Sequence, residues 1–173
     1  MRREVLLVPY DPAWPIRFET EARKIAPIFG SNLVRMHHIG STAIPGILAK
    51  PIIDMLFEVM DIEQVDAVNE AAGQLGYQAM GEYGIPGRRY FRRLEGTVHL
   101  FHLHVFAVDD PEVTRHVHFR DYLRAHPEEA KAYQEIKVQL AETFFNDVGA
   151  YTDGKTTFIQ MVDARAKTWV ENR

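Results

Sequence analysis

The sequence predicts an α/β fold, built as a single domain over residues 1–173 with helices gathered toward its C-terminal end. Two observations carry this prediction. Short apolar runs typical of strands alternate with helical patterns as far as Val108, whereas after Pro111 apolar residues recur only at helical spacing. A chain of 173 residues is also long enough to form one full core and short for two.

Composition narrows the functional classes. An apolar content of 46% with 25% charged residues is ordinary for a soluble globular protein. The formal charge of −4 argues against general nucleic-acid binding. The absence of cysteine excludes disulfides and thiolate metal ligands and fits a cytoplasmic protein, and no apolar run approaches membrane-spanning length. The oligomeric state stays open.

The strands are predicted from short apolar and β-branched runs bounded by turn residues. A short strand at residues 4–8 comes first, and Asp11-Pro12 then begins a helix that Gly30 ends. Further strands are expected over residues 33–39, 51–59, 77–83, 89–94 and 98–108. The run at 51–59 is almost wholly apolar, which is typical of a strand at the centre of a sheet.

The remaining helices are predicted from capping residues. Asp61, with Gln64 three residues later, begins a helix that Gly76 closes. A helix also starts at the segment 126–129, and the last one at the segment 152–155. The inner face of that last helix is expected to comprise Phe158, Met161, Val162, Arg165 and Trp169.

The segment Gly40-Ser41-Thr42 is a candidate phosphate cradle. Glycine allows the backbone to approach a phosphate closely, and the hydroxyls and free N–H groups bind its oxygens. The competing interpretation is a plain turn after a strand. Asp54 favours the functional one, because an aspartate inside an apolar strand requires a cation, a metal or hydrogen-bond donors. A structural Asp that caps a nearby loop is the alternative.

Histidines on a later strand are candidate partners of Asp54. By strand alternation His102 and His104 face the same way, roughly 6.5 Å apart, whereas His99 points oppositely. Two imidazoles on one face are able to share a metal or a phosphate. A half-solvated strand face explains the pattern equally well. The same alternation places Asp54, Leu56 and Glu58 on one face of their own strand.

Basic side chains supply further candidate phosphate contacts. Lys50 precedes the strand that carries Asp54, and Lys155 is expected in the first turn of a helix, where backbone N–H groups favour an anion. Arg89 and Arg93 belong to a cluster of four arginines, and each is able to bind a phosphate through two parallel N–H groups. The alternative for each lysine is an ordinary surface position.

Several blocks of the chain together resemble the GrpB family. They are the segments 38–46, 49–54 and 102–105, the run Phe119-Arg120-Asp121-Tyr122-Leu123-Arg124, and Tyr151-Thr152 with Lys155-Thr156. The resemblance extends over nearly the whole chain. It implies a nucleotidyltransferase-like fold with a mixed central sheet and C-terminal helices, and kinship with the extra domain fused to some bacterial dephospho-CoA kinases.

The same resemblance assigns roles to residues of the candidate site. Gly40-Ser41 resembles the Gly-Ser of the superfamily signature, and Asp54 resembles its first metal-binding carboxylate. The position of the second acid holds Leu56, and His102 or His104 stands where a third carboxylate is expected. Two-metal phosphoryl transfer needs several acids, so this departure weakens the expectation of catalysis.

The sequence supports three functional hypotheses. The first is a nucleotidyltransferase-like enzyme that binds a nucleotide or phospho-metabolite with Mg²⁺ or Mn²⁺, with Asp54, His102 and His104 as catalytic and metal-binding residues. Its phosphate contacts are Gly40, Ser41, Thr42, Lys50, Arg89, Arg93 and Lys155. The second is an inactive nucleotide- or phosphate-binding module. The third is a zinc- or manganese-dependent hydrolase, which the fold resemblance does not support.

Overall fold

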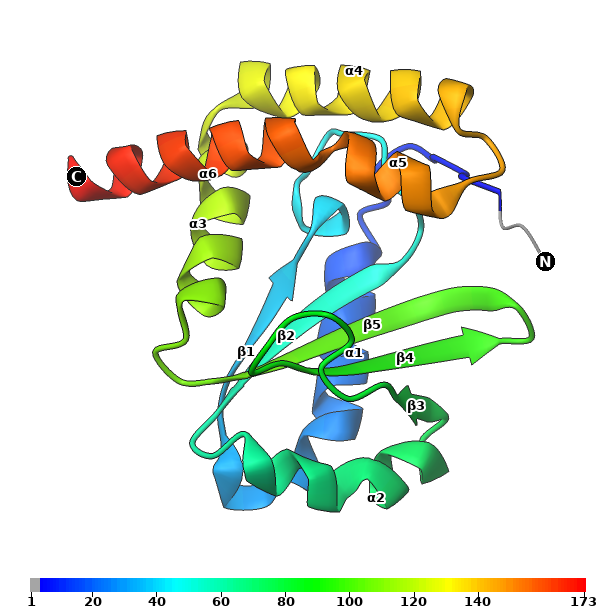
Figure 1. The fold of residues 1–173 in the computed structure, drawn as a ribbon, viewed down its shortest axis with the longest axis vertical. Helices are drawn as coiled ribbons and strands as arrows, with labels where there is room; N and C mark the ends of the chain where they lie inside the picture. Colours follow the sequence, from blue (N-terminus) through cyan, green and yellow to red (C-terminus); the bar gives the residue numbers. More distant parts are fainter. Residues whose placement is uncertain (1–3) are drawn as a thin grey trace.

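The computed structural model describes residues 4–173. A five-stranded sheet forms its middle layer (Figure 1), with strands β1 (Leu33–Ile39), β2 (Ile53–Val59), β3 (Tyr77–Ala79), β4 (Arg89–Glu95) and β5 (Val98–Ala107). The helices are α1 (Trp14–Ile25), α2 (Asn69–Gln74), α3 (Pro111–Ala125), α4 (Pro127–Thr143), α5 (Val148–Gly154) and α6 (Thr156–Glu171). Short 3₁₀ segments are η1 (Ala26–Asn32), η2 (Ser41–Ala43) and η3 (Glu63–Val68).

The strand order is β1-β2-β5-β4-β3, and the sheet is mixed. Strands β2 and β5 run parallel, whereas the pairs β1–β2, β4–β5 and β3–β4 are antiparallel. The register opposes Asp54 to His102 and Leu56 to His104. The predicted α/β class with a mixed sheet is therefore confirmed, and β2 lies inside the sheet as its apolar sequence predicts.

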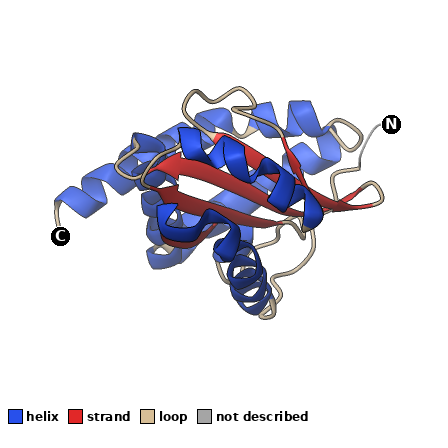
Figure 2. Cartoon of the chain, turned by 90° about the horizontal axis from the view of Figure 1, so that it is seen from below, coloured by secondary structure: helices blue, strands red, loops and turns tan. Residues whose placement is uncertain are grey.

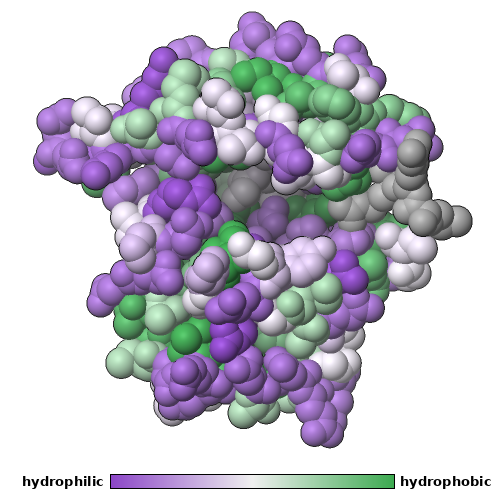
Figure 3. Space-filling view, viewed as in Figure 1, coloured by the Kyte–Doolittle hydropathy of each residue, from purple (hydrophilic) through white to green (hydrophobic). Residues whose placement is uncertain are grey.

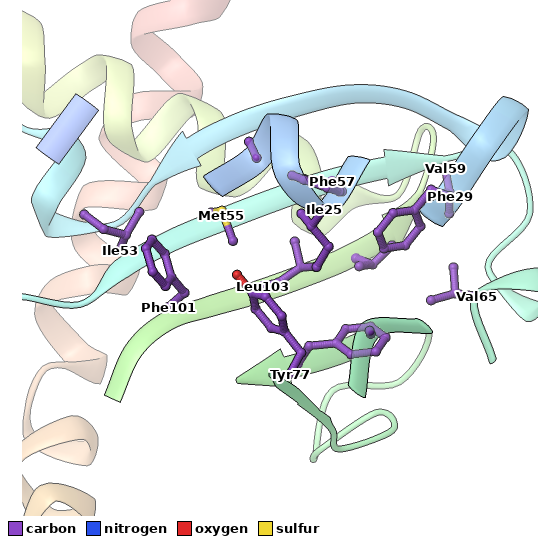
Figure 4. Packing of buried hydrophobic residues seen from close by; sticks show 14 of the residues in the cluster. Ile25, Phe29, Ile53, Met55, Phe57, Val59, Val65, Tyr77, Phe101 and Leu103 are labelled. Carbon is purple, nitrogen blue, oxygen red and sulfur yellow. The ribbon is translucent and has the colours of Figure 1, made fainter. Parts of the chain in front are cut away.

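One face of the sheet forms the main core. Alternate residues of β2 (Ile53, Met55, Phe57 and Val59) are completely buried on it. They pack with Leu103 of β5 and with Ile25 and Phe29, which belong to α1 and η1 (Figure 4). Because a strand alternates its side chains, this packing turns Asp54, Leu56 and Glu58 to the opposite face, as the sequence predicts.

The C-terminal helices form a second core of their own beside the sheet. It joins Leu123 of α3, Tyr133 of α4 and Val162 of α6, and it includes Ile44 and Ile47 from the segment between β1 and β2. In the view of Figure 2 the sheet is a twisted layer with helices against it. Among residues 4–173, no helix is both long and apolar enough to cross a membrane.

Several predictions about secondary structure differ from the structure. The segment 4–8 makes only an isolated bridge between Val8 and Ala49 instead of a strand. The strand predicted at 77–83 ends at Ala79, where a glycine-rich loop begins. The segment 152–155, predicted to start the last helix, instead contains the end of α5, and α6 starts at Thr156 after Lys155. On α6 the residues at helical spacing from Phe158 that are buried are Val162 and Ala166, whereas Met161 is 39% exposed.

Candidate functional site

A pocket of about 680 Å³ lies over the carboxylate of Asp54. One wall is the sheet, the second is the loop between β3 and β4, and the third is α5 with the start of α6. Figure 3 shows a hollow between the helices and the strands, with hydrophilic side chains around it. Its lining includes Gly40, Lys50, Asp54, Tyr83, Tyr90, Arg92, His99, His102, His104, His116, Thr152, Asp153 and Lys155.

Gly40 makes room for Asp54. It comes directly after β1, and its neighbour Ile39 pairs with Asp54 in the sheet. Its φ of 72° and ψ of −172° belong to a region that essentially only glycine adopts. A Cβ at this position would lie 2.8 Å from the Asp54 Oδ2 atom. Glycine is therefore required here by both backbone conformation and space, and its backbone lies against the acid.

Two imidazoles flank the Asp54 carboxylate. Its Oδ1 atom lies 3.4 Å from His104 Nε2 and 3.5 Å from His102 Nδ1. Burial favours the protonated acid, but hydrogen bonds from the two histidines outweigh it and hold the pKa of Asp54 below its usual range. The side chain is 29% exposed. Asp54 is therefore an ionised carboxylate that a ligand in the pocket is able to reach.

His104 is fixed in one tautomer by its neighbours. Arg88 Nη1 lies 3.3 Å from His104 Nδ1, and a guanidinium only donates hydrogen bonds. Burial lowers the pKa of His104 by more than the nearby Asp54 carboxylate raises it, so the ring is neutral. Its proton is on Nε2, which faces the carboxylate. Arg88 itself is buried. His104 thus donates to Asp54 and positions it.

His99 lies in the pocket, against the prediction that it points oppositely to His102. Its Nδ1 atom is 2.8 Å from His102 Nε2. The reason is a register shift between Arg93 and Leu94, because β4 pairs Arg93 with Phe101 but Leu94 with His99. The extra residue of this bulge, Leu100, reverses the alternation at the start of β5.

Lysines concentrate positive charge at the helical wall. Lys50 Nζ and Lys155 Nζ lie 5.1 and 4.6 Å from the ring centroid of Tyr151, so both ammonium groups share one aromatic side chain. Burial and the charge of Lys50 lower the pKa of Lys155 to about 8. Lys137, buried behind them, donates to the carbonyl of Leu48, and burial lowers its pKa to about 7. The two predicted lysines therefore share one pocket with Asp54.

The prediction that Arg89 and Arg93 share this pocket is wrong. Arg89 donates to Asp66 at 2.7 Å, and Arg93 donates to Glu21 at the same distance, both on the opposite face of the sheet. The register explains it, because Arg93 pairs with the core residue Phe101 and Arg92 pairs with His102. The arginine that lines the pocket is Arg92.

Ser41 and Thr42 of the Gly-Ser-Thr turn do not line the pocket. Thr42 is buried, and its Oγ1 atom lies 2.9 Å from His38 Nε2. Ser41 lies beside Tyr133 of α4. Helix α3 holds the same turn through Arg124 Nε, which donates to the carbonyl of Ala43 at 2.7 Å. Of the predicted cradle only Gly40 lines the pocket, while Ser41 and Thr42 anchor the turn to its surroundings.

The position expected for the second acid of a two-metal site is closed to the pocket. Leu56, which occupies it, is completely buried among Ile39, Phe106 and Val113. Glu58, one alternation further, is buried and lies 2.6 Å from His37 Nε2. Among the described residues of β2, Asp54 is therefore the one carboxylate that reaches the pocket.

The residues suit some divalent metals better than others. Within residues 4–173, no group of three or more histidine and acidic side chains is placed so that it could hold a metal ion. A zinc site on Asp54, His102 and His104 therefore does not fit, since zinc needs at least three protein ligands at about 2.0–2.2 Å. Mg²⁺ fits better, because it keeps several waters and takes one or two carboxylates together with substrate phosphates. Asp54 supplies one such carboxylate.

Comparison with known proteins agrees with the resemblance seen in the sequence. The family model described as GrpB protein matches residues 4–165. YqkA of Bacillus subtilis is 41% identical over 172 residues, which cover 99% of this chain and 50% of YqkA. The glutamate-rich protein GrpB of Alkalihalophilus pseudofirmus is 35% identical over 92% of this chain and 94% of its own.

A solved structure and a kinase sequence are also similar to this chain. The crystal structure of GrpB from Enterococcus faecalis superposes with a TM-score of 0.89 at 38% identity, covering 95% of this chain and 99% of that one. A dephospho-CoA kinase of Mycolicibacterium paratuberculosis is 27% identical over 99% of this chain and 48% of the kinase. The chain thus spans about half the length of YqkA and of that kinase.

Proposed function

Starting from a chain that belongs to the GrpB family, we propose that its Asp54 pocket binds a nucleotide or phosphorylated metabolite together with a divalent cation. The phosphates lie on the predicted Lys50 and Lys155 and on Arg92, which takes the place of the predicted Arg89 and Arg93. Asp54 provides the protein ligand for Mg²⁺ or Mn²⁺.

The main support for this proposal is the excess of positive over negative side chains in the pocket. Among the described residues, three cationic side chains (Lys50, Lys155 and Arg92) line it together with two carboxylates, Asp54 and Asp153. Lys155 is half-buried, and this burial lowers its pKa. An anion that entered would relieve the repulsion between the two lysines, and partial burial would strengthen its attraction to them.

Within this pocket Asp54 stays ionised and accepts hydrogen bonds from histidines. A divalent ion bound to it would neutralise phosphate charge. The burial of Leu56 at the position of the partner acid favours binding over two-metal nucleotidyl transfer. A transferase is the second candidate, supported by the ionised Asp54 and by two imidazoles that are able to move protons at the pocket floor.

Titration calorimetry tests the proposal directly. ATP, CTP and tripolyphosphate are titrated into the wild-type chain and into Lys155→Gln and Lys50→Gln, with and without Mg²⁺. We expect binding by the wild type and a loss of about 10- to 100-fold in affinity for each substitution, since a charge-assisted hydrogen bond contributes roughly 1.5–3 kcal/mol. Lys24→Gln is the matched control, because Lys24 is exposed on α1 outside the pocket.

The outcomes separate the candidates. Equal affinities of the wild type and both pocket variants, or no binding of any phosphate compound, would overturn the proposal. Release of pyrophosphate from ATP by the wild type, lost in Asp54→Asn, would establish the transferase over the binding module.

A further inference from the structure

Tyr83 is an exposed aromatic side chain at the edge of the pocket. It lines the pocket and is 57% exposed, whereas the neighbouring Tyr90 is buried. The two rings stack with centroids 5.1 Å apart and planes at 14°. One face of the Tyr83 ring thus lies on Tyr90, and much of the remaining side chain is open to solvent.

The loop around Tyr83 is held in an unusual conformation. Tyr83 has a φ of 47°, in the left-handed region that non-glycine residues rarely adopt. The buried Arg88 stabilises it, because Arg88 Nη2 donates to the carbonyl of Tyr83 at 2.7 Å and Nε donates to that of Glu82 at 3.1 Å. The backbone that carries the exposed ring is therefore held in place, and the ring itself stacks on Tyr90.

The same arginine connects this loop to the pocket floor. Arg88 contacts His104, which in turn lies against Asp54. The Arg88 guanidinium also lies 4.9 Å from the Tyr90 ring centroid, and the Tyr90 ring contacts both His102 and His104. A continuous group of packed rings therefore leads from Asp54 to the open face of Tyr83.

We propose that the pocket takes a nucleotide whose base stacks on the exposed face of Tyr83 while its phosphates lie on Lys50 and Lys155. This inference rests on the proposed function and names its substrate class. The other aromatic side chain beside the lysines, Tyr151, is 1% exposed and has both ammonium groups over its ring, so it leaves no face for a base. Stacking on Tyr83 tolerates any base, because every base has a π-face.

The test compares ligands with and without a base. ATP, CTP and tripolyphosphate are titrated into wild type, Tyr83→Ala, Tyr83→Phe and Tyr83→Trp. We expect ATP and CTP to bind the wild type about tenfold or more tighter than tripolyphosphate. Tyr83→Ala should remove this advantage and leave tripolyphosphate unchanged, whereas Tyr83→Phe and Tyr83→Trp should retain it. Because Tyr83 is exposed, all three variants are expected to fold, which circular dichroism checks.

Each outcome bears on one proposal. If the wild type binds tripolyphosphate as tightly as ATP, or if Tyr83→Ala weakens all three ligands equally, base stacking is wrong and phosphate binding stands. If the wild type binds none of the three, the proposed function fails and this inference fails with it.

Discussion

Asp54 and Glu58 lie on the same face of the same strand, yet their environments differ. Asp54 is 29% exposed at the pocket floor, with His102 and His104 beside it. The side chain of Glu58 is 5% exposed and bonds His37 at 2.6 Å. The difference arises from the neighbouring strand β1, because Gly40 at its end leaves space above Asp54, whereas His37 within it covers Glu58.

Asp54 is therefore accessible to a ligand, whereas Glu58 is buried in an interaction that stabilises the fold. Between them, Leu56 lies in an apolar cluster that closes the pocket floor. On β2, the carboxylate that lines the pocket is the one beside a glycine and facing cationic side chains. Substitutions along β2 and around the pocket test this division.

The largest effect is expected from placing an acid at the middle position. Leu56→Asp would bury an unpaired carboxylate among Ile39, Phe106 and Val113 and should lower the free energy of unfolding by about 4 kcal/mol or more. Leu56→Met, which keeps the volume, should cost less than about 1.5 kcal/mol. Urea denaturation measures both, and a stable Leu56→Asp variant would show that the position tolerates a second acid.

Filling the space above Asp54 should affect both stability and binding. Gly40→Ala introduces backbone strain of about 1–3 kcal/mol and a Cβ that would displace the Asp54 carboxylate. Gly46→Ala is the matched control, because Gly46 also has a positive φ but has nothing within 4 Å of an added Cβ. We expect only Gly40→Ala to weaken Mg²⁺-dependent ATP binding, by about tenfold; equal effects on binding would contradict the role of Gly40.

Neutralising Glu58 should reduce the stability of the fold without changing ligand binding. Glu58→Gln weakens the buried bond to His37 and is expected to lower the free energy of unfolding by about 1–2 kcal/mol. ATP affinity should stay at the wild-type value, since Glu58 does not line the pocket. A change in affinity without a change in stability would place Glu58 in the site instead.

The smallest effect is a pH dependence of binding. Phosphate favours protonated Lys155, whose pKa is lowered to about 8 by burial and by Lys50. Affinity for tripolyphosphate should therefore fall as pH rises through 8, by at most about tenfold between pH 7 and pH 9. Calorimetry in buffers of different ionisation enthalpy should also detect proton uptake near pH 8. Lys155→Gln should flatten the profile, and an unchanged profile in that variant would assign it to another group.

Most of the fold could be predicted from the sequence, because the almost wholly apolar run of β2 and the capping residues are local signals. Six of the predicted site residues line the same pocket: Gly40, Lys50, Asp54, His102, His104 and Lys155. For the arginines the prediction is wrong, since only the register that pairs Arg92 with His102 decides which of them face the pocket. The bulge that turns His99 inward and the position of Tyr83 depend equally on long-range pairing, which spacing along one chain does not reveal.

One calorimetric comparison tests the central claim, that Asp54 is an ionised acid facing a cationic pocket. ATP is titrated into wild type and Asp54→Asn at pH 7, with and without Mg²⁺. We predict that Mg²⁺ strengthens binding to the wild type only, and that without metal Asp54→Asn binds ATP at least as tightly as wild type, because a repelling charge is gone. Weaker metal-free binding by Asp54→Asn, or an equal gain from Mg²⁺ in both proteins, would contradict the account.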